Sequence, residues 1–254
     1  MENNKQDSLN GHKEKNKKNM KSLIKTEDYD SLASAEGLRV VYDKTTDLVW
    51  IDTPQPLCGF VDLGLPSGLK WATTNVGAEK PEDFGLYFAW GETQGYTGIT
   101  DEKQFSWSDY KLCGGSNKTL TKYNTNSSYG TVDNKLVLEQ VDDAAYTSDK
   151  TCRMPTKSDF EELTANTTSV WETLNGVKGR RFTSKTNGNS IFVPAAGVCD
   201  GGSVYYVGSH GNLWSSSLYE SNSRNAWGLN FNSVDMGVYG NSRYFGFTVR
   251  AVKK

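Results

Sequence analysis

The sequence predicts an α+β fold made mostly of short antiparallel strands, with one or two helices. At least seven short runs alternate apolar with polar residues, which is the period-two pattern of a half-buried strand. Turns rich in Gly, Asn and Ser separate these runs. One stretch also carries the spacing and capping signals of a helix. Many short strands beside one or two helices are typical of the α+β class.

Length and charge divide the chain into a tail and a domain. The 254 residues suffice for one core of about 200 residues and an extension. We assign residues 1–37 to a charged N-terminal arm, with seven Lys in the first 25 positions, and residues 38–254 to the domain. The arm is expected to be flexible, or to become ordered on a virion or another partner. No apolar run follows its basic residues, so we expect no export signal and synthesis in the cytoplasm.

Composition argues against several classes of partner. The formal charge of -2 predicts no basic face for nucleic acid. No apolar run approaches the roughly 18 residues needed to cross a bilayer, so no membrane insertion is expected. The cysteines fit no zinc pattern and are expected to be free thiols; they are Cys58, Cys113, Cys152 and Cys199. We expect no cofactor, and the sequence indicates no particular oligomeric state.

Local signals place the elements of the first half. Residues 38–42 and 47–52 are predicted to form a hairpin around the polar turn at 43–46. Alternating Val, Leu and Leu at positions 61, 63 and 65 predict a strand, and the turn at 66–68 leads to a second strand at 69–72. Aromatic residues are then expected in the core; these are Tyr87, Phe88 and Trp90.

The second half begins with loops and the one clear helix. Residues 94–150 lack periodicity and predict long ordered loops, with a short helical or extended segment at 136–145. The helix is expected at 151–167, where Pro155 and Thr156 open it and Ser158 and Glu161 have capping-box spacing. Phe160 lies on its apolar face. Strands are predicted at 180–183, 190–194 and 204–207.

Residues 213–252 combine a scaffold pattern with the composition of a contact surface. No Lys and only three acidic residues occur between positions 186 and 252, although 23% of the chain is charged. Depletion of charge with enrichment of Tyr and Trp is typical of an interface centre. Apolar residues assigned to the scaffold are Trp214, Trp227, Leu229, Phe231, Phe245, Phe247 and Val249. The intervening positions, which include Asn230 and Asn232 and, in the last segment, Tyr244, Gly246, Thr248 and Arg250, are predicted to be exposed.

Several stretches resemble one family of domains. They are VDLGLPSGLKWATTNVGAEKPEDFGLYFAWGET from Val61, DDAA leading into RMPTKSDFEEL, LWSSSLYE and RYFGFTVRAV. In this order, across about residues 60–252, they are similar to the major paralogous domain family called FISUMP. That family is similar to the formylglycine-generating-enzyme branch of the C-type lectin fold. The resemblance implies this fold for the chain, and it leaves function open because one fold serves many functions.

The C-terminal stretch, about residues 205–250, also resembles the variable region of proteins diversified by retroelements. In those proteins, adenine replacement in codons such as AAC yields Asn, Ser, Asp, Gly, Tyr or Thr at selected positions. The resemblance implies a diversified binding surface on a C-type lectin-like scaffold, with Tyr219, Tyr239 and Tyr244 as aromatic anchors. The expected ligand-binding residues are Tyr205, Tyr219, Asn222, Ser223, Asn225, Asn230, Asn232, Asp235, Tyr239, Asn241 and Tyr244.

An enzymatic function is the alternative, and the sequence lacks the residues that it would require. Formylglycine-generating enzymes bind copper through paired cysteines near the C-terminus, where this chain has only Cys199. Related iron enzymes use several His ligands, whereas this chain has His12 and His210. Ser215, Ser216 and Ser217 match the family's WSSS element and are expected to make structural hydrogen bonds. The sugar-binding elements of calcium-dependent lectins are absent, and the pair at 142 and 143 is expected in a solvated loop.

We therefore expect a non-enzymatic binding protein. Its ligand would be a protein or a surface glycan on a host cell or another macromolecule, recognised by a phage tail protein or a bacterial adhesin. Such a protein belongs on a virion or a cell surface. An oxidoreductase like the formylglycine-generating enzymes and a purely structural surface module stay as alternatives.

Overall fold

The computed structural model describes residues 23–24, 39–43, 48–52, 59–98 and 103–254. The chain divides into two compact units, residues 1–55 and residues 56–254. In the first unit β1 (Leu23–Ile24), β2 (Arg39–Asp43) and β3 (Leu48–Asp52) form an antiparallel sheet in the order β1-β3-β2. The hairpin predicted at 38–52 is confirmed. Most of the predicted arm, its boundary at 37 and Cys58 lie outside the described residues.

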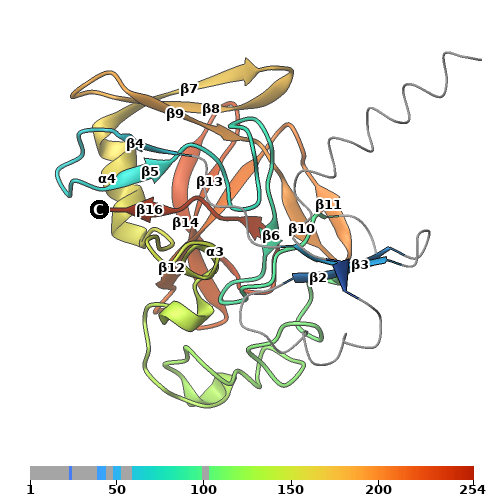
Figure 1. The fold of residues 1–254 in the computed structure, drawn as a ribbon. Helices are drawn as coiled ribbons and strands as arrows, with labels where there is room; N and C mark the ends of the chain where they lie inside the picture. The colour runs from blue at the N-terminus through green and yellow to red at the C-terminus, as the bar shows by residue number, and fades with distance from the viewer. Residues whose placement is uncertain (1–22, 25–38, 44–47, 53–58, 99–102) are drawn as a thin grey trace, which may run out of the picture. The chain divides into compact units, whose positions relative to one another are not determined.

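The second unit contains the remaining strands. A five-stranded sheet has the order β14-β13-β12-β15-β6, in which β12 and β15 run parallel and the other neighbours antiparallel. Its strands are β6 (Tyr87–Phe88), β12 (Gly211–Leu218), β13 (Asn225–Phe231), β14 (Met236–Ser242) and β15 (Phe247–Thr248). Figure 1 shows α4 (Lys157–Asn166) beside this sheet.

Three smaller sheets complete the unit, with the orders β16-β5-β4, β7-β8-β9 and β10-β11. Their strands are β4 (Phe60–Asp62), β5 (Lys70–Ala72), β7 (Thr167–Leu174), β8 (Val177–Ser184), β9 (Ser190–Pro194), β10 (Val198–Asp200), β11 (Ser203–Tyr205) and β16 (Val252–Lys253). Strands predominate over helices, so the predicted α+β class is confirmed.

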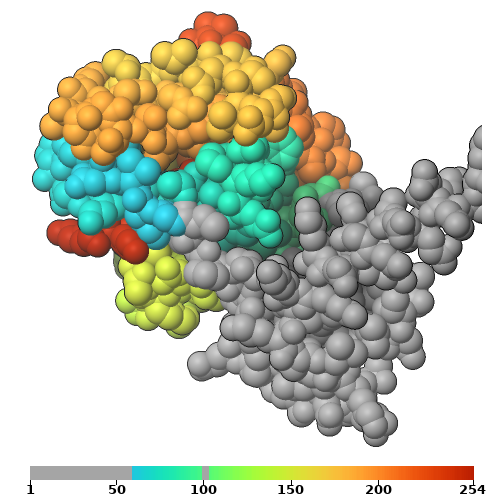
Figure 2. Space-filling model, turned by 45° about the horizontal axis from the view of Figure 1, so that its top comes forward, coloured from blue at the N-terminus to red at the C-terminus, as the bar shows by residue number. Residues whose placement is uncertain are grey.

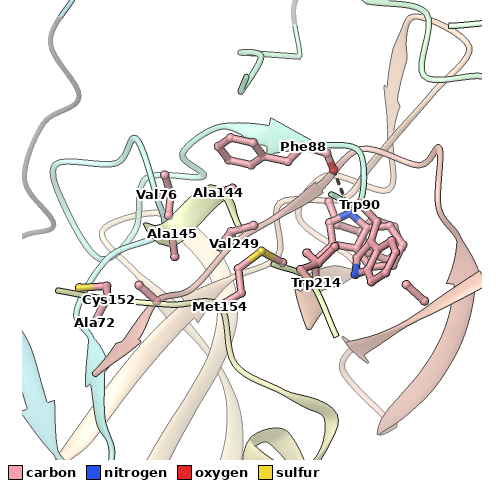
Figure 3. Close-up of a cluster of buried hydrophobic side chains, with 14 of the residues drawn as sticks. Ala72, Val76, Phe88, Trp90, Ala144, Ala145, Cys152, Met154, Trp214 and Val249 are labelled. Carbon is pink, nitrogen blue, oxygen red and sulfur yellow. Dashed lines mark hydrogen bonds between the residues drawn. The ribbon is translucent and has the colours of Figure 1, made fainter. Parts of the chain in front are cut away.

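The core consists of apolar clusters on both sides of the five-stranded sheet. Successive side chains of a strand point to opposite faces, and adjacent residues of β12 accordingly join different clusters. Leu213 packs with Leu229 and Phe231, whereas Trp214 packs with Phe247 at a centroid distance of 4.3 Å. The Trp214 indole donates to the Phe88 carbonyl over 2.8 Å (Figure 3). These aromatic residues were correctly predicted to be core.

The loops predicted at 94–150 are present, and their described residues contain only short elements. These are 3-10 turns at Ser127–Tyr129 and Gln140–Asp142 and the helix α3 (Ala144–Ser148). The Asp143 side chain caps α3 through the N–H groups of Ala145 and Tyr146 and also accepts from the Met154 N–H. This buried carboxylate is therefore structural. Asp142 pairs instead with Lys122 and Tyr123.

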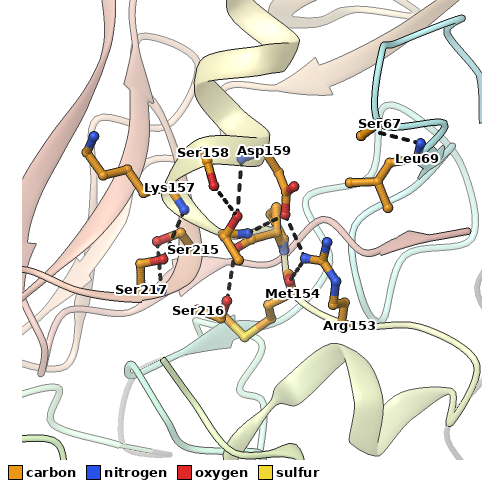
Figure 4. A network of polar contacts seen from close by, with 12 residues as sticks. Ser67, Leu69, Arg153, Met154, Lys157, Ser158, Asp159, Ser215, Ser216 and Ser217 are labelled. Atoms are coloured by element: carbon orange, nitrogen blue, oxygen red, sulfur yellow. Dashed lines mark hydrogen bonds and ion pairs between the residues drawn. The ribbon is translucent and has the colours of Figure 1, made fainter. Parts of the chain in front are cut away.

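The predicted helix is confirmed, and its capping box lies two residues earlier than expected. Thr156 is the N-cap, and its hydroxyl and the Asp159 carboxylate exchange hydrogen bonds with each other's backbone N–H. Ser158, predicted to open the box, is exposed and lies inside the helix. Figure 4 shows the serines of β12 below this helix start. The Ser217 hydroxyl accepts from the Lys157 N–H over 3.0 Å, so the serines are structural as predicted.

The prediction of an exposed face in the last segment is wrong. Thr248 is buried because β15 lies between β12 and β6. Gly246 and Arg250, which flank this strand, are buried as well, and Gly246 forms a bridge with Cys199. Arg250 is fully buried and donates to Asn75 and to the carbonyls of Ala72 and Phe192. Burial lowers the pKa of Arg250 to about 9. This side chain ties three segments together and takes no part in a surface.

Candidate functional site

One side of the five-stranded sheet carries a group of polar residues at its β14 end. We call Asn212, Asn230, Asn241 and Tyr239 the asparagine face. In the strand register Asn212 lies opposite Asn230, and Asn241 and Tyr239 lie opposite Ala226 and Gly228. Directly opposed residues in a sheet point to the same side. The four side chains therefore project from one surface, and the prediction that Asn230 points away from Leu229 and Phe231 is confirmed.

The three asparagines form a continuous hydrogen-bond network. The Asn230 amide donates to Asn212 over 2.6 Å and to Asn241 over 3.2 Å. The Asn241 amide returns a bond to Asn230 over 3.0 Å and donates to the Tyr239 carbonyl over 2.9 Å. Asn212 is buried and donates to the Gly197 carbonyl. The network thus extends from β14 across the sheet to the segment before β10.

Within this network the side-chain N–H donors of Asn230 and Asn241 are all used, whereas their amide oxygens can accept further hydrogen bonds. An amide nitrogen has two hydrogens and an amide oxygen has two lone pairs, so the donors of Asn230 and Asn241 are both fully engaged. Among the described residues each oxygen accepts one hydrogen bond, which leaves it one lone pair. The Tyr239 hydroxyl donates to the exposed Asp235 carboxylate over 3.2 Å, and this hydrogen bond raises the pKa of Tyr239. The face is consequently rich in acceptors.

Other predicted contact residues shape the turns at the two ends of β13. The Asn232 side chain accepts from the N–H groups of Val234 and Asp235, which closes the β13–β14 turn. Asn222 accepts from the backbone and side chain of Arg224. Asn225 is half-buried at the start of β13. The predicted residues therefore form separate groups, because Asn222 and Asn232 lie beyond opposite ends of one strand.

The prediction that Ser223 contacts a ligand is wrong. Its side chain is fully buried, and its hydroxyl pairs with Thr125 over 2.9 Å and also accepts from the Thr125 N–H. The Ser223 carbonyl accepts from the buried guanidinium of Arg243. Ser223 therefore joins the β12–β13 turn to the long loop. Its small polar side chain resembles that of a contact residue, which misled the sequence argument.

The predicted tyrosine anchors differ in exposure. Tyr239 is 48% exposed. Tyr219 is half-buried, with its ring edge-on to Trp227 at 4.6 Å and close above Gly240. Tyr244 is half-buried against Trp107 at 5.2 Å. Tyr205, in β11, is 49% exposed. Of the three anchors, Tyr239 alone presents half of its surface.

Sequence reasoning missed three residues, of which only Asn212 belongs to the asparagine face. Asn212 completes the amide network, and only the register against Asn230 could have identified it. Tyr206 is 62% exposed and packs against His210 at 4.9 Å. Val234 is 90% exposed in the β13–β14 turn. Figure 2 shows the red-orange segment containing this turn standing out beyond β7–β9.

Residues able to carry chemistry are dispersed in the described part of the chain. There, no group of three or more His, Cys, Asp or Glu residues lies together as a metal site would require. The described cysteines Cys113 and Cys152 are free thiols, as predicted. Lys103 is buried and forms an ion pair with Glu92 over 2.9 Å. No described helix is long and apolar enough to cross a membrane.

Comparison with known protein families finds a match to the C-terminal part of the chain. The model of a family described as a domain of unknown function, DUF8237, matches residues 163–252. This segment starts within α4 and runs to β16, so it contains the whole asparagine face. No curated protein matches the chain. No solved structure matches it.

Proposed function

We propose that this protein binds a macromolecular ligand through the asparagine face and that the fold beneath it is a C-type lectin-like scaffold. The observation that carries the proposal is the placement of Asn230, Asn241 and Tyr239 on a partly exposed sheet surface. Asparagine is a poor strand former. The Asn230 and Asn241 side chains bond to each other, while the apolar core packs separately through Leu229 and Phe231. A role in recognition explains residues that neither the strand nor the core requires.

The free acceptors define the chemistry of the ligand. The unused lone pairs on Asn230 and Asn241 and the Asp235 carboxylate call for donors such as amide, hydroxyl or ammonium groups. Tyr239 adds a large ring that loses little conformational entropy on binding. A protein surface or a glycan on a host cell meets both requirements. A virion or a cell surface is the proposed location.

We further propose that these positions are diversified by a retroelement. Asn, Tyr, Ser, Gly and Asp are accessible from an AAC-like codon, and apart from Val234 they fill the exposed positions of β13, β14 and the intervening turn. Scaffold residues such as Trp214, Leu229 and Phe231 are excluded from variation because their replacement would open the core. The resemblance of about residues 205–250 to the variable region of proteins diversified by retroelements supports the same proposal.

The surrounding genome tests diversification. We expect a near-identical copy of the DNA encoding about residues 205–250 beside a reverse transcriptase gene, with differences confined to adenines of the copy. The altered codons should include those of Asn230, Tyr239 and Asn241. Absence of such a copy, or differences at the codons of Trp214 and Leu229, would overturn this proposal. If the protein is instead a structural module of constant sequence, no such copy is expected.

A further inference from the structure

The outer edge of β14 carries backbone groups that point away from the sheet. The backbone N–H of Arg243 donates to the Arg224 carbonyl, and that of Asn232 donates to the Asp235 carbonyl. These two bonds lie at the two ends of the β13–β14 ladder and fix which residue pairs are hydrogen-bonded. Hydrogen-bonded pairs alternate with non-hydrogen-bonded pairs in an antiparallel ladder. Gly237, Tyr239 and Asn241 therefore bond to β13. The residues that direct their N–H and C=O groups outward are Met236, Val238, Gly240 and Ser242.

This edge has almost no hydrogen-bond partners in the described part of the chain. The Ser242 carbonyl accepts from the Phe245 N–H over 3.0 Å. No other hydrogen bond from a described residue reaches the outward backbone groups of β14. The opposite edge of the same sheet differs, because Tyr87 of β6 exchanges backbone hydrogen bonds with Tyr96 over 2.8 and 3.0 Å.

The sequence of β14 lacks the usual protection of an edge strand. Proteins commonly guard such edges with charged residues, with proline or with a bulge. Residues 236–242 read MGVYGNS, with no charge and no proline, and the pairing with β13 is regular throughout. For comparison, the edge strand β7 carries Glu172. An unprotected, regular edge is a template for another strand.

We propose that β14 pairs antiparallel with β14 of a second copy of this chain, about a twofold axis at Tyr239. The outward residues lie symmetrically around Tyr239, so each hydrogen-bonding residue meets another. Val238 then lies opposite Gly240 of the second copy, Met236 opposite its Ser242, and Gly237 opposite its Asn241. Larger residues thus face smaller ones, and no like charges meet. This self-complementarity favours a second copy over an unrelated strand.

The two Tyr239 residues form the centre of the pairing. They occupy a non-hydrogen-bonded position, where opposed side chains approach most closely and aromatic pairs contribute favourably. Their rings remain on the asparagine face. The pairing would join two five-stranded sheets into one and place the two asparagine faces side by side. It does not depend on what the face binds.

Sedimentation velocity on the full chain tests the pairing. We expect a dimer whose fraction rises with concentration through the micromolar range. Tyr239→Lys should raise the dimer Kd about tenfold or more, because like charges directly opposite one another are unfavourable. Tyr239→Phe is the matched control and should leave the dimer intact. Mixing Tyr239→Lys with Tyr239→Glu copies should restore a mixed dimer, because the axis brings the two positions together.

A second variant examines the backbone. Val238→Pro removes an N–H that points away from β13, a position where an edge strand tolerates proline. It should dissociate the dimer, and circular dichroism should show a retained fold. A monomer at all concentrations would overturn the proposal, as would a dimer unaffected by Tyr239→Lys and Val238→Pro. A monomer that captures an extended peptide along β14 would overturn it in favour of a different occupant.

Discussion

At the scale of single residues, Tyr123 shows how a buried polar group depends on its partners. Its side chain is fully buried. Its hydroxyl donates to Asp142 over 2.5 Å and accepts from the Glu139 N–H over 2.9 Å. Burial, followed by the bond to the Asp142 carboxylate, raises the pKa of Tyr123 to about 12. The folded state therefore favours the protonated phenol.

This shift predicts a loss of stability in alkali. The unfolded pKa of tyrosine is about 10, so the stabilisation is fully present below pH 10 and is lost as the pH rises toward 12. Tyr123→Phe removes this ionisation and should flatten the decline by up to about 1.4 kcal/mol per pH unit. Urea unfolding of both proteins across this range measures the difference. Identical slopes would contradict the assignment.

Residue patterns identified part of the candidate site. The alternation around Leu229 placed Asn230 on the side away from the apolar residues, because that signal is local to one strand. Asn212 was missed because its partnership with Asn230 exists only in the paired sheet. Ser223 was misassigned because the sequence does not distinguish a turn serine that faces solvent from one that bonds to a distant loop.

At the scale of elements, the start of α4 is fixed by its cap and by the serines of β12. Thr156→Ala should destabilise the protein by about 1 kcal/mol, because the Asp159 N–H loses its acceptor. Ser158→Ala is the matched control. Among the described residues its exposed hydroxyl bonds only to the Thr156 hydroxyl, so the cost should be a few tenths of a kcal/mol. Chemical denaturation measures both, and equal losses would contradict the assigned cap.

Helices and hairpins were predictable where their signals are local. The turn at 66–68 and the hairpin at 38–52 depend on neighbouring residues, and both were predicted. The environment of β15 was not predictable. Its neighbours β12 and β6 come from distant parts of the chain, and their presence turns an apparently half-exposed strand into a central one.

At the scale of the whole molecule, the residues that stabilise the second unit differ from those that form its exposed polar surface. Apolar clusters on both sides of the five-stranded sheet hold the fold, while the asparagine face lies at the β14 end. The α+β class followed from the sequence because strand patterns dominate it. The order of strands in the sheets did not, since it depends on contacts between remote segments.

The central claim is that the asparagine face can vary and bind while the core cannot vary. It is tested most directly by displaying on yeast a library that encodes Asn, Ser, Asp, Gly, Tyr and Thr at positions 230, 239 and 241. A control library uses the same residues at Trp214, Leu229 and Phe231. Protease resistance measures folding, and panning on immobilised lysozyme measures binding.

We predict that most members of the first library stay folded and resist protease, since positions 230, 239 and 241 hold no side chain of the apolar clusters. The largest expected cost is about 1–3 kcal/mol, where replacement of Asn230 leaves the buried Asn212 oxygen without its donor. Panning should enrich binders from it. The control library should unfold, because truncating buried apolar side chains costs about 2–5 kcal/mol each. Equal loss of protease resistance in both libraries, or a stable first library without binders, would contradict the claim.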